Sequence, residues 1–354
     1  MTSTVFTNAR KQVQRLNLCV DAQKTGFDGV ELSEHLCVSM INITQNVLAG
    51  TDADEERSKQ NFHLNERLLI GKMTTYILLC APWLRHVAYF SKCFDFIKSG
   101  PAMARATQHQ TVVAYRQGHN ESNFLKHYVT SMKKLYPPGS GPSHERELYY
   151  NLERTMVEMY GAGSETTVTM MSFSVLYMAK FPHVLERVRQ EVDAAWTDDD
   201  DLHYLRMSMP YTRATILELL RHVSIAYVSV QTLMTETKID GYKLPAGTIL
   251  YADLWGVNHD KKYWKDPQNF RPERFIKEVD GKPTFVKDKH VITFSTGKRK
   301  CPGEGMAMDE LFVFLIHIVK NFDIKAPEGE ELDIRPVVDL LHRCPEFRCT
   351  LSRR

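Results

Sequence analysis

The sequence predicts a mainly α-helical protein with a small β part, on three observations. Over most of the first two thirds of the chain, apolar residues recur three or four positions apart. Alternating segments broken by turn residues begin only after about residue 225. The 354 residues are 43% hydrophobic and 25% charged, which is the composition of an ordinary globular protein with a sizeable core.

The expected helices follow one another in chain order. The apolar repeat from Leu32 to Val47 predicts a helix that ends at Gly50, a C-cap glycine. Further helical runs are expected around 68–84 and 123–136, and the Pro- and Gly-rich segment 137–143 predicts a loop. A long helix is expected from about Glu145 to Lys180, another begins at Pro182, and the acidic segment 197–204 is expected to be a solvated loop.

The β part is expected in a small sheet late in the chain. Segments 225–234 and 237–254 alternate, with turns at Asp240-Gly241 and at 245–247. Farther on, the apolar run Leu311–Val319 predicts a buried helix, because it has half the length that a membrane span needs. The N-terminal residues show neither a signal peptide nor a membrane anchor.

Charge and cysteine content exclude several classes of protein. The 45 basic and 43 acidic residues give a formal charge of +2, which argues against a nucleic-acid partner. The seven cysteines form no CxxC pair and are too sparse for a disulfide scaffold, so a reducing compartment is expected.

One cysteine, Cys301 in "FSTGKRKCPGEG", stands between a cation-rich turn and a helical run. A free cysteine is most often only a small buried hydrophobe. Here Pro302 is expected near the first helical position, and the helix dipole together with Lys298 and Lys300 favours the thiolate. A single thiolate does not make a zinc site, but it suits an iron already held by a macrocycle, as in haem.

The same segment resembles the haem-binding signature of the cytochromes P450. The matching residues are Phe294, Gly297, Arg299, Cys301 and Gly303. The resemblance implies a haem b cofactor, with Cys301 as the axial iron ligand and Arg299 bound to a haem propionate. The two glycines leave no side chain beside the ligand, and the phenylalanine is expected to shield it from water.

A second segment, "GAGSETT", places Gly161 and Gly163 inside a strong helical pattern, where each costs about 1 kcal/mol relative to alanine. Either the helix is distorted there to open a groove, or the glycines form a helix-packing face. The segment resembles the oxygen-binding motif of the P450 long helix. That resemblance implies that Thr166 bonds dioxygen and that Glu165 relays protons.

Two more segments resemble the family. Glu218 and Arg221 in "LELLR" lie on one helix face, a pair that means little alone. Together with Arg274 in "FRPERF" they match the Glu–Arg–Arg network that P450s bury behind the haem, where losing one member costs about 3–5 kcal/mol.

The resemblance runs from about Asp28 to the C-terminus and is strongest after Glu145. It implies one haem-thiolate domain over 1–354, with the haem-binding core mainly in 145–354, and a P450 fold that lacks its N-terminal sheet and first helices. The sequence is similar to that of microsomal P450s, the type that includes animal drug- and steroid-metabolising members. Such relatives carry a proline and a basic residue that faces a haem propionate. At these positions this chain has Val230 and Gln231.

The implied function is a monooxygenase that inserts one oxygen atom from O2 into a small lipophilic substrate. Electrons are expected from NADPH through cytochrome P450 reductase, with cytochrome b5 as a further partner. Lys298 and Lys300 are expected in the docking patch, and the apolar segment Ser224–Val230 in the substrate pocket. The full-length form is expected on the cytosolic face of the endoplasmic reticulum membrane. The alternatives are a truncated, catalytically silent chain that binds haem weakly or not at all, and a helical interaction protein without cofactor.

Overall fold

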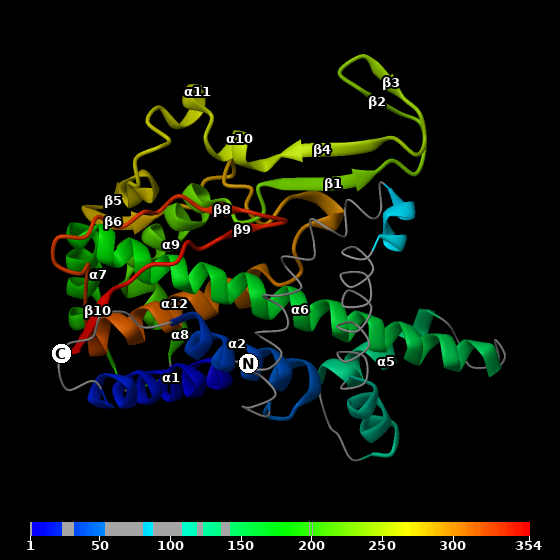
Figure 1. Cartoon of the computed structure of the whole chain (residues 1–354), viewed down its shortest axis with the longest axis horizontal. Coiled ribbons are helices and arrows are strands. Elements are labelled where there is room, and N and C mark those ends of the chain that lie inside the picture. Colours follow the sequence, from blue (N-terminus) through cyan, green and yellow to red (C-terminus); the bar gives the residue numbers. More distant parts are fainter. Residues whose placement is uncertain are drawn as a thin grey trace. The chain divides into compact units, whose positions relative to one another are not determined.

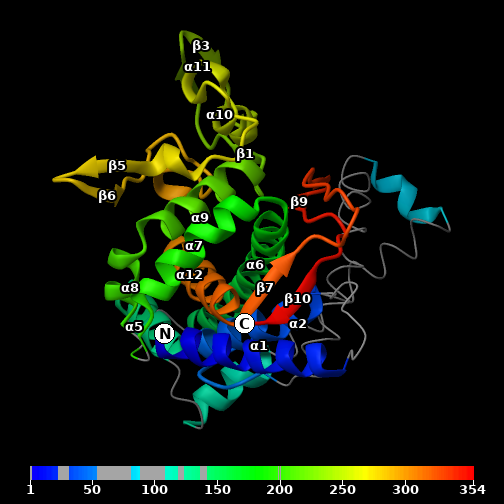
Figure 2. The ribbon, with the colours of Figure 1, turned by 90° about the vertical axis from the view of Figure 1, so that its left-hand side faces the viewer.

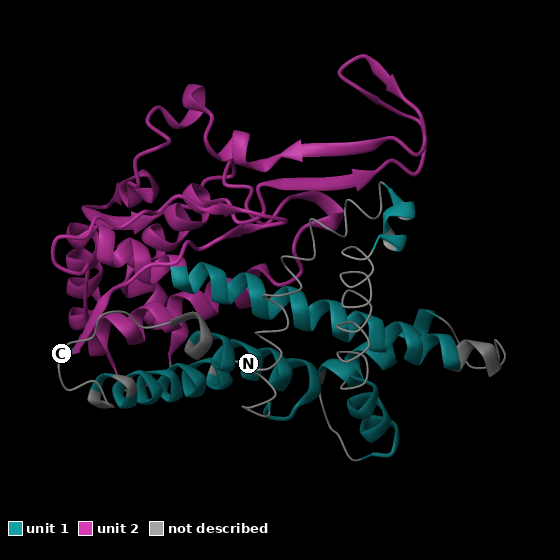
Figure 3. Cartoon of the chain, viewed as in Figure 1, with its two compact units in different colours: residues 1–172, 353 teal, residues 173–352, 354 magenta. Residues whose placement is uncertain are grey.

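The computed structural model describes residues 2–22, 32–53, 81–87, 108–118, 123–135, 142–197, 199 and 201–354. The chain forms two compact units, residues 1–172 with 353 and residues 173–352 with 354 (Figure 3). The expectation of a single domain remains a prediction. The predicted class is confirmed, because helices dominate and the strands of the described residues all lie late in the chain (Figure 1).

Apart from Arg353, the described elements of the first unit are helices and a 3-10 turn. Its elements are α1 (Thr2–Ala22), α2 (Leu32–Ala49), the 3-10 turn η1 (Pro82–His86), a helix over 108–116, α5 (Asn123–Leu135) and most of α6 (Pro142–Lys180). The predicted cap is confirmed: Gly50 has φ of +69° and its N–H donates to Asn46 O at 2.8 Å. The helical run expected at 68–84 lies largely outside the described residues.

Two kinds of contact hold this unit together. An apolar core joins the helices around α6, through Leu48, Ala49, Val112, Leu125, Val129, Leu148, Leu152 and Met156. Between α1 and α2, which both bury apolar side chains, there are also polar contacts: Asn42 donates to Asn8 at 2.8 Å, and Ser39 donates to Gln12 at 2.8 Å. Buried polar groups of this kind are tolerated only when they are hydrogen-bonded, and these pairs fix how the two helices align.

The second unit is built on three packed helices, α7 (Pro182–Ala195), α9 (Pro210–Val223) and α12 (Glu304–Asn321) (Figure 2). Shorter helices are α8 (Leu202–Ser208), α10 (Leu254–Asn258) and α11 (Lys261–Trp264). The run Leu311–Val319 is buried within α12, as the sequence predicted. The segment 197–204 is not wholly a loop, because the Asp201 carboxylate accepts from Tyr204 N and begins α8.

The β part consists of separate two-stranded ladders rather than one small sheet. The pairs are β1 (Val228–Thr232) with β4 (Ile249–Asp253), β2 (Thr237–Ile239) with β3 (Tyr242–Leu244), β5 (Ile276–Val279) with β6 (Lys282–Phe285), β7 (Phe322–Lys325) with β10 (Thr350–Arg353), and β8 (Val337–Val338) with β9 (His342–Arg343). The predicted turns are present: Asp240, Gly241 and Gly247 all have positive φ. These turns occupy the left-handed region, which glycine enters at little cost.

Candidate active site

The loop that precedes Cys301 is closed by its own backbone. Ser295 N donates to Ile292 O at 2.8 Å, and Cys301 N donates to Phe294 O at 2.9 Å. Between them lies a single 3-10 turn, η3 (Gly297–Arg299). The thiol therefore stands at the end of a tight loop with a fixed path.

Gly297 is required in this loop by its backbone conformation. Its φ is +74°, a region that side-chain-bearing residues enter at a cost of about 1–2 kcal/mol. A Cβ added there would meet no atom within 4 Å, so space is not the constraint. Ser295 also has a positive φ, +62°, which marks the loop as tightly constrained.

The helix after Cys301 begins later than the sequence predicted. Helix α12 starts at Glu304 with Gly303 at its N-cap, so Pro302 lies in the preceding turn and not at the first helical position. The reason is that the chain must change direction after Cys301 before its N–H groups can point along the axis of α12. A Cβ added at Gly303 would lie 3.8 Å from the Cys301 Sγ, so this glycine keeps one flank of the thiol clear.

A main-chain carbonyl of α9 and a side chain of α10 anchor the loop to the core. Thr293 Oγ1 donates to Leu220 O at 3.1 Å, and Ile292 N donates to Asn258 Oδ1 at 3.3 Å. The amide of Asn258 also donates to Ser224 Oγ at 2.9 Å. Asn258 is fully buried, and sequence reasoning missed it because a lone asparagine in a loop segment carries no spacing signal.

The structure brings together the three residues of the predicted Glu–Arg–Arg network. Arg221 donates to both Glu218 oxygens, at 2.7 Å from Nε and 2.8 Å from Nη2. Arg274 Nε donates to Glu218 Oε1 at 3.2 Å. The side chains of Glu218 and Arg221 are fully buried and that of Arg274 is 6% exposed, so these charges depend on one another for compensation.

The two guanidinium groups also bind backbone carbonyls of the segment that follows α10. Arg221 donates to Asn258 O at 2.7 Å and to Pro267 O at 2.9 Å. Arg274 donates to Trp264 O at 2.7 Å and also to Asp266 O. The network thereby fixes the course of residues 258–269 against α9, the helix on which the Cys301 loop rests.

Helix α9 is held at its other end by a carboxylate that the sequence did not single out for this role. Glu191 on α7 accepts from the N–H groups of Tyr211 and Thr212, at 2.7 Å each. Free N–H groups at a helix start need such an acceptor. Burial raises the pKa of the Glu191 carboxyl, and these hydrogen bonds act in the opposite direction.

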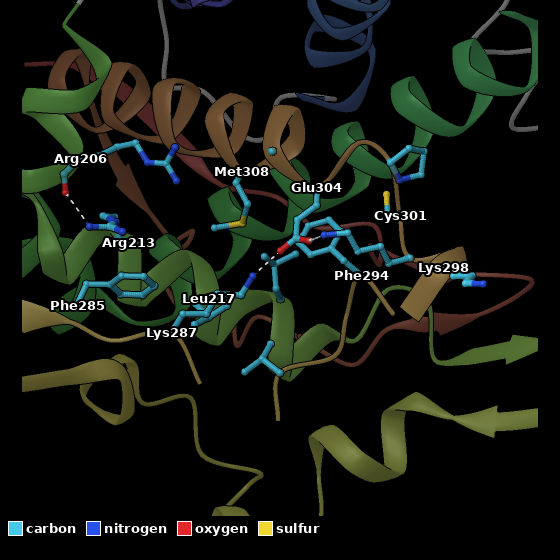
Figure 4. Close-up of a pocket in the computed structure, with 15 residues that line it drawn as sticks. Arg206, Arg213, Leu217, Phe285, Lys287, Phe294, Lys298, Cys301, Glu304 and Met308 are labelled. Atoms are coloured by element: carbon cyan, nitrogen blue, oxygen red, sulfur yellow. Dashed lines mark hydrogen bonds and ion pairs between the residues drawn. The ribbon is translucent and has the colours of Figure 1, made fainter. Parts of the chain in front are cut away.

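Cys301 and Phe294 line a cavity of about 600 Å³ within the second unit (Figure 4). Its walls include five cationic side chains and one carboxylate, Glu304; the cations are Arg206, Arg213, Lys287, Lys298 and Lys300. Glu304 forms ion pairs with Lys287 and Lys300. The thiol therefore borders a space with a strong excess of positive charge.

The residues around Cys301 fit a haem ligand. Its thiol is free and half-exposed. Among the described residues, no three His, Cys, Asp or Glu side chains are grouped to hold a metal ion, so a ligand set of the zinc type is not formed. Arg299 is exposed next to the loop, where its guanidinium is open to a carboxylate.

The predicted distal residues lie on α6 in the first unit. Residues 161–167 remain α-helical, so the predicted distortion is wrong as far as a break in the helix is concerned. Thr166 Oγ1 donates to Ala162 O at 2.7 Å, which supports the turn locally. A Cβ at Gly163 would lie 3.6 Å from Thr44 on α2, which favours the helix-packing alternative at that glycine. Thr166 and Cys301 belong to different units, so their joint action in one site stays a prediction.

A comparison with protein-family models matches residues 2–347 to the model described as "Cytochrome P450". The chain belongs to the cytochrome P450 family. The match begins earlier than Asp28, where the sequence resemblance was expected to start. Within the described ranges of this P450, no helix combines the length and the apolar character needed to cross a membrane.

The P450 chain is similar to several animal members of the family. It is 39% identical over 180 residues to cytochrome P450 2L1 of Panulirus argus, which covers 50% of this chain and 36% of that protein. It is 34% identical over 201 residues to cytochrome P450 1A1 of Opsanus tau, covering 56% and 39%, and 34% identical over 232 residues to cytochrome P450 2B15 of Rattus norvegicus, covering 63% and 44%. The chain thus matches less than half of the length of these curated relatives.

The departure at Val230 and Gln231 falls on β1 of this P450. Gln231 is exposed and lies opposite Leu250 of β4, and Val230 is 48% exposed. Neither side chain carries the positive charge that the resemblance would place there. The loss of one propionate contact, and with it a lower affinity for haem, therefore stays a prediction.

Proposed function

We propose that this P450 is a haem-thiolate monooxygenase that inserts one oxygen atom from O2 into a lipophilic substrate. The observation that carries the proposal is the position of Cys301. Its free thiol stands at the end of a backbone-closed loop that is anchored to α9 and α10. Membership of the family gives this single thiolate its expected partner, a haem iron.

Cys301 would hold the iron and Arg299 a haem propionate. When bound, the haem would supply the activation of O2, a chemistry that a thiolate ligand favours. The protein contributes position: the closed loop and Gly297 fix the thiol, and Gly303 keeps the approach to its sulfur free. Phe294, which lines the same cavity, would keep water from the ligand.

Glu165 and Thr166 would move protons on the opposite side. The Thr166 hydroxyl donates to Ala162 O in this structure, so its oxygen lone pairs are open to accept a hydrogen bond. The carboxyl group of Glu165 stands next to it in sequence, half-exposed, and is suited to exchange protons with water.

Electrons would come from NADPH through the P450 reductase, with cytochrome b5 as a second donor. Lys298 and Lys300 are exposed beside the Cys301 loop and are suited to an acidic docking partner. The full-length protein would act at the cytosolic face of the endoplasmic reticulum membrane. Its substrate would lie against residues 224–230, which include the buried Ile225 and are mostly apolar.

The test is the Soret spectrum of the reduced carbon monoxide adduct. The haem-loaded chain should show the red-shifted band of a thiolate-ligated haem, and Cys301→Ser should lose it. Cys344→Ser, a thiol elsewhere in the same unit, serves as control and should keep the band. A red-shifted band in Cys301→Ser would remove this cysteine from the site, whereas a parent chain with little or no bound haem and no NADPH-driven product would favour the silent alternative.

A further inference from the structure

The cavity beside Cys301 extends well away from the thiol. In Figure 4 Cys301 lies at one end, and Arg206, Arg213 and Phe285 lie at the other. Leu217 and Met308 line the space between them. The proposed oxygen chemistry gives this far end no role.

Most of the cations in the cavity are already paired. Lys287 and Lys300 pair with Glu304, and Arg206 pairs with Asp309 on α12. The structure pairs neither Arg213 nor Lys298 with a carboxylate among its described residues. The cavity thus keeps two cations that no acid compensates, one near each end.

Arg213 is held in place more firmly than a surface arginine. Its guanidinium lies 4.3 Å from the centre of the Phe285 ring, and its Nη1 donates to Arg206 O at 3.4 Å. Desolvation and the neighbouring Arg206 lower the pKa of the Arg213 side chain. A half-buried cation that no carboxylate pairs with raises the free energy of the folded state. An anion bound there would therefore stabilise the protein.

The rest of the cavity wall is largely apolar, through Leu217, Leu220, Phe285, Val291, Phe294 and Met308. A small inorganic anion would leave this surface uncovered. The volume of about 600 Å³ lies within the range of ~300–1,000 Å³ typical of small-molecule pockets. Unpaired cations near its ends, Arg213 and Lys298, together with apolar walls between them, describe an amphipathic ligand with an anionic head group.

We propose that this cavity binds a long-chain carboxylate, with the head group on Arg213 and the acyl chain along the apolar walls toward Phe294. The site goes beyond the proposed function, because it requires a cation and an apolar surface but no oxygen chemistry. Free fatty acids are the simplest ligands of this class. Binding depends on both parts of the ligand: the charge sets the position of the head group, and the burial of the chain supplies most of the affinity.

The test measures displacement of a fluorescent long-chain fatty acid from the haem-loaded chain. An azole that coordinates the haem iron is present throughout, so the distal substrate site is filled. Oleate should displace the probe, whereas oleyl alcohol and inorganic phosphate should each do so at least about 10-fold less well, because each supplies only one half of the interaction. Equal displacement by phosphate would reduce the site to a simple anion patch and overturn the proposal.

Arg213→Gln should weaken oleate binding by about 10- to 100-fold, the loss expected for one charge-assisted hydrogen bond. Lys277→Gln, an exposed cation on β5 outside the cavity, should leave the affinity unchanged. Arg213→Lys keeps the charge and should retain intermediate affinity, which provides a second reading if the glutamine variant folds poorly. Unchanged oleate affinity in both Arg213 variants would overturn the proposal.

Haem content and turnover are measured on the same preparations. A chain that binds oleate at Arg213 but forms no product would contradict the proposed function and leave this inference standing. A chain that turns over normally but does not bind oleate with the azole present would contradict only this inference.

Discussion

The loop at Cys301 and the Gly161–Thr167 stretch of α6 carry the two halves of the proposed chemistry, and they are held in place by different means. The loop is fixed by bonds from residues far away in sequence, such as Thr293 to Leu220 and Ile292 to Asn258. In the α6 stretch the Thr166 hydroxyl bonds the carbonyl four residues earlier, as any helical threonine can. The proposed iron ligand therefore depends on the tertiary fold, whereas the proposed distal threonine depends mainly on its own helix.

This difference predicts where substitutions cost stability and where they cost only chemistry. Changes in the support of the Cys301 loop should lower the free energy of unfolding, because buried partners are left without compensation. Changes at Thr166 should leave stability nearly unchanged and alter the reaction.

The largest effect is expected for Glu218→Gln. It removes the charge that compensates Arg221 and one of the two carboxylates that pair with Arg274, the other being Asp266. The loss should cost about 3–5 kcal/mol of unfolding free energy together with haem retention. Chemical denaturation and haem per polypeptide measure both. Glu186→Gln is the matched control, because its side chain is 55% exposed and its ion pair with Arg189 spans 3.6 Å. A fully stable Glu218→Gln protein with a normal haem content would show that the network is not structural.

Asn258→Ala should come next, at about 2 kcal/mol, because Ile292 N and Ser224 Oγ lose a buried partner. The thiolate band should also weaken, since this side chain anchors the start of the Cys301 loop. Asn269→Ala is the control: its side chain is exposed, and its carbonyl, which accepts from Arg274, remains. If both variants melt at the same temperature, the anchoring role of Asn258 is wrong.

A pair of glycines on either side of Cys301 should respond in opposite directions. Gly297→Ala should cost about 1 kcal/mol or more, because φ there is +74°. Gly305→Ala in α12 meets no atom within 4 Å and should stabilise by about 0.5–1 kcal/mol. Thermal unfolding of the two variants measures the difference, and a change of the same sign in both would contradict the conformational argument.

The smallest effect on stability, within about 0.5 kcal/mol, is expected for Thr166→Ala. Its effect on chemistry should be larger: NADPH consumption should continue while more of it ends in hydrogen peroxide and less in product, since proton delivery is impaired. Thr155→Ala removes the same kind of local hydrogen bond, here to Asn151 O at 2.9 Å, outside the motif. Equal coupling of NADPH to product in the two variants would count against Thr166 as a proton-delivery residue.

The sequence was informative wherever one residue or one short pattern determined the outcome. Gly50 and the buried run Leu311–Val319 follow from local conformation and periodicity, whereas the positive φ of Gly297 was not predicted. Contacts between distant segments did not follow in this way. The joining of Arg274 to Glu218 was expected only through the family resemblance, because no spacing relates residues 56 positions apart.

Two supports of the site could not be anticipated at all. Glu191 binds the start of α9 from 20 residues away, and Asn258 joins α10 to the Cys301 loop across 34 residues. In sequence each is one polar residue among many on a surface-like pattern. Their roles arise from packing, which brings a carboxylate to a helix start and an amide to an unpaired N–H.

The bonds from Arg221 and Arg274 to main-chain carbonyls have a consequence for how freely the sequence of 258–269 can diverge. The acceptors are carbonyl oxygens of Asn258, Pro267, Trp264 and Asp266, which every amino acid possesses. A substitution there changes a side chain but leaves the acceptor in place, provided that the backbone keeps its course. Related chains can therefore differ widely in the amino-acid sequence of this segment while retaining the two arginines and the glutamate that fix its backbone conformation.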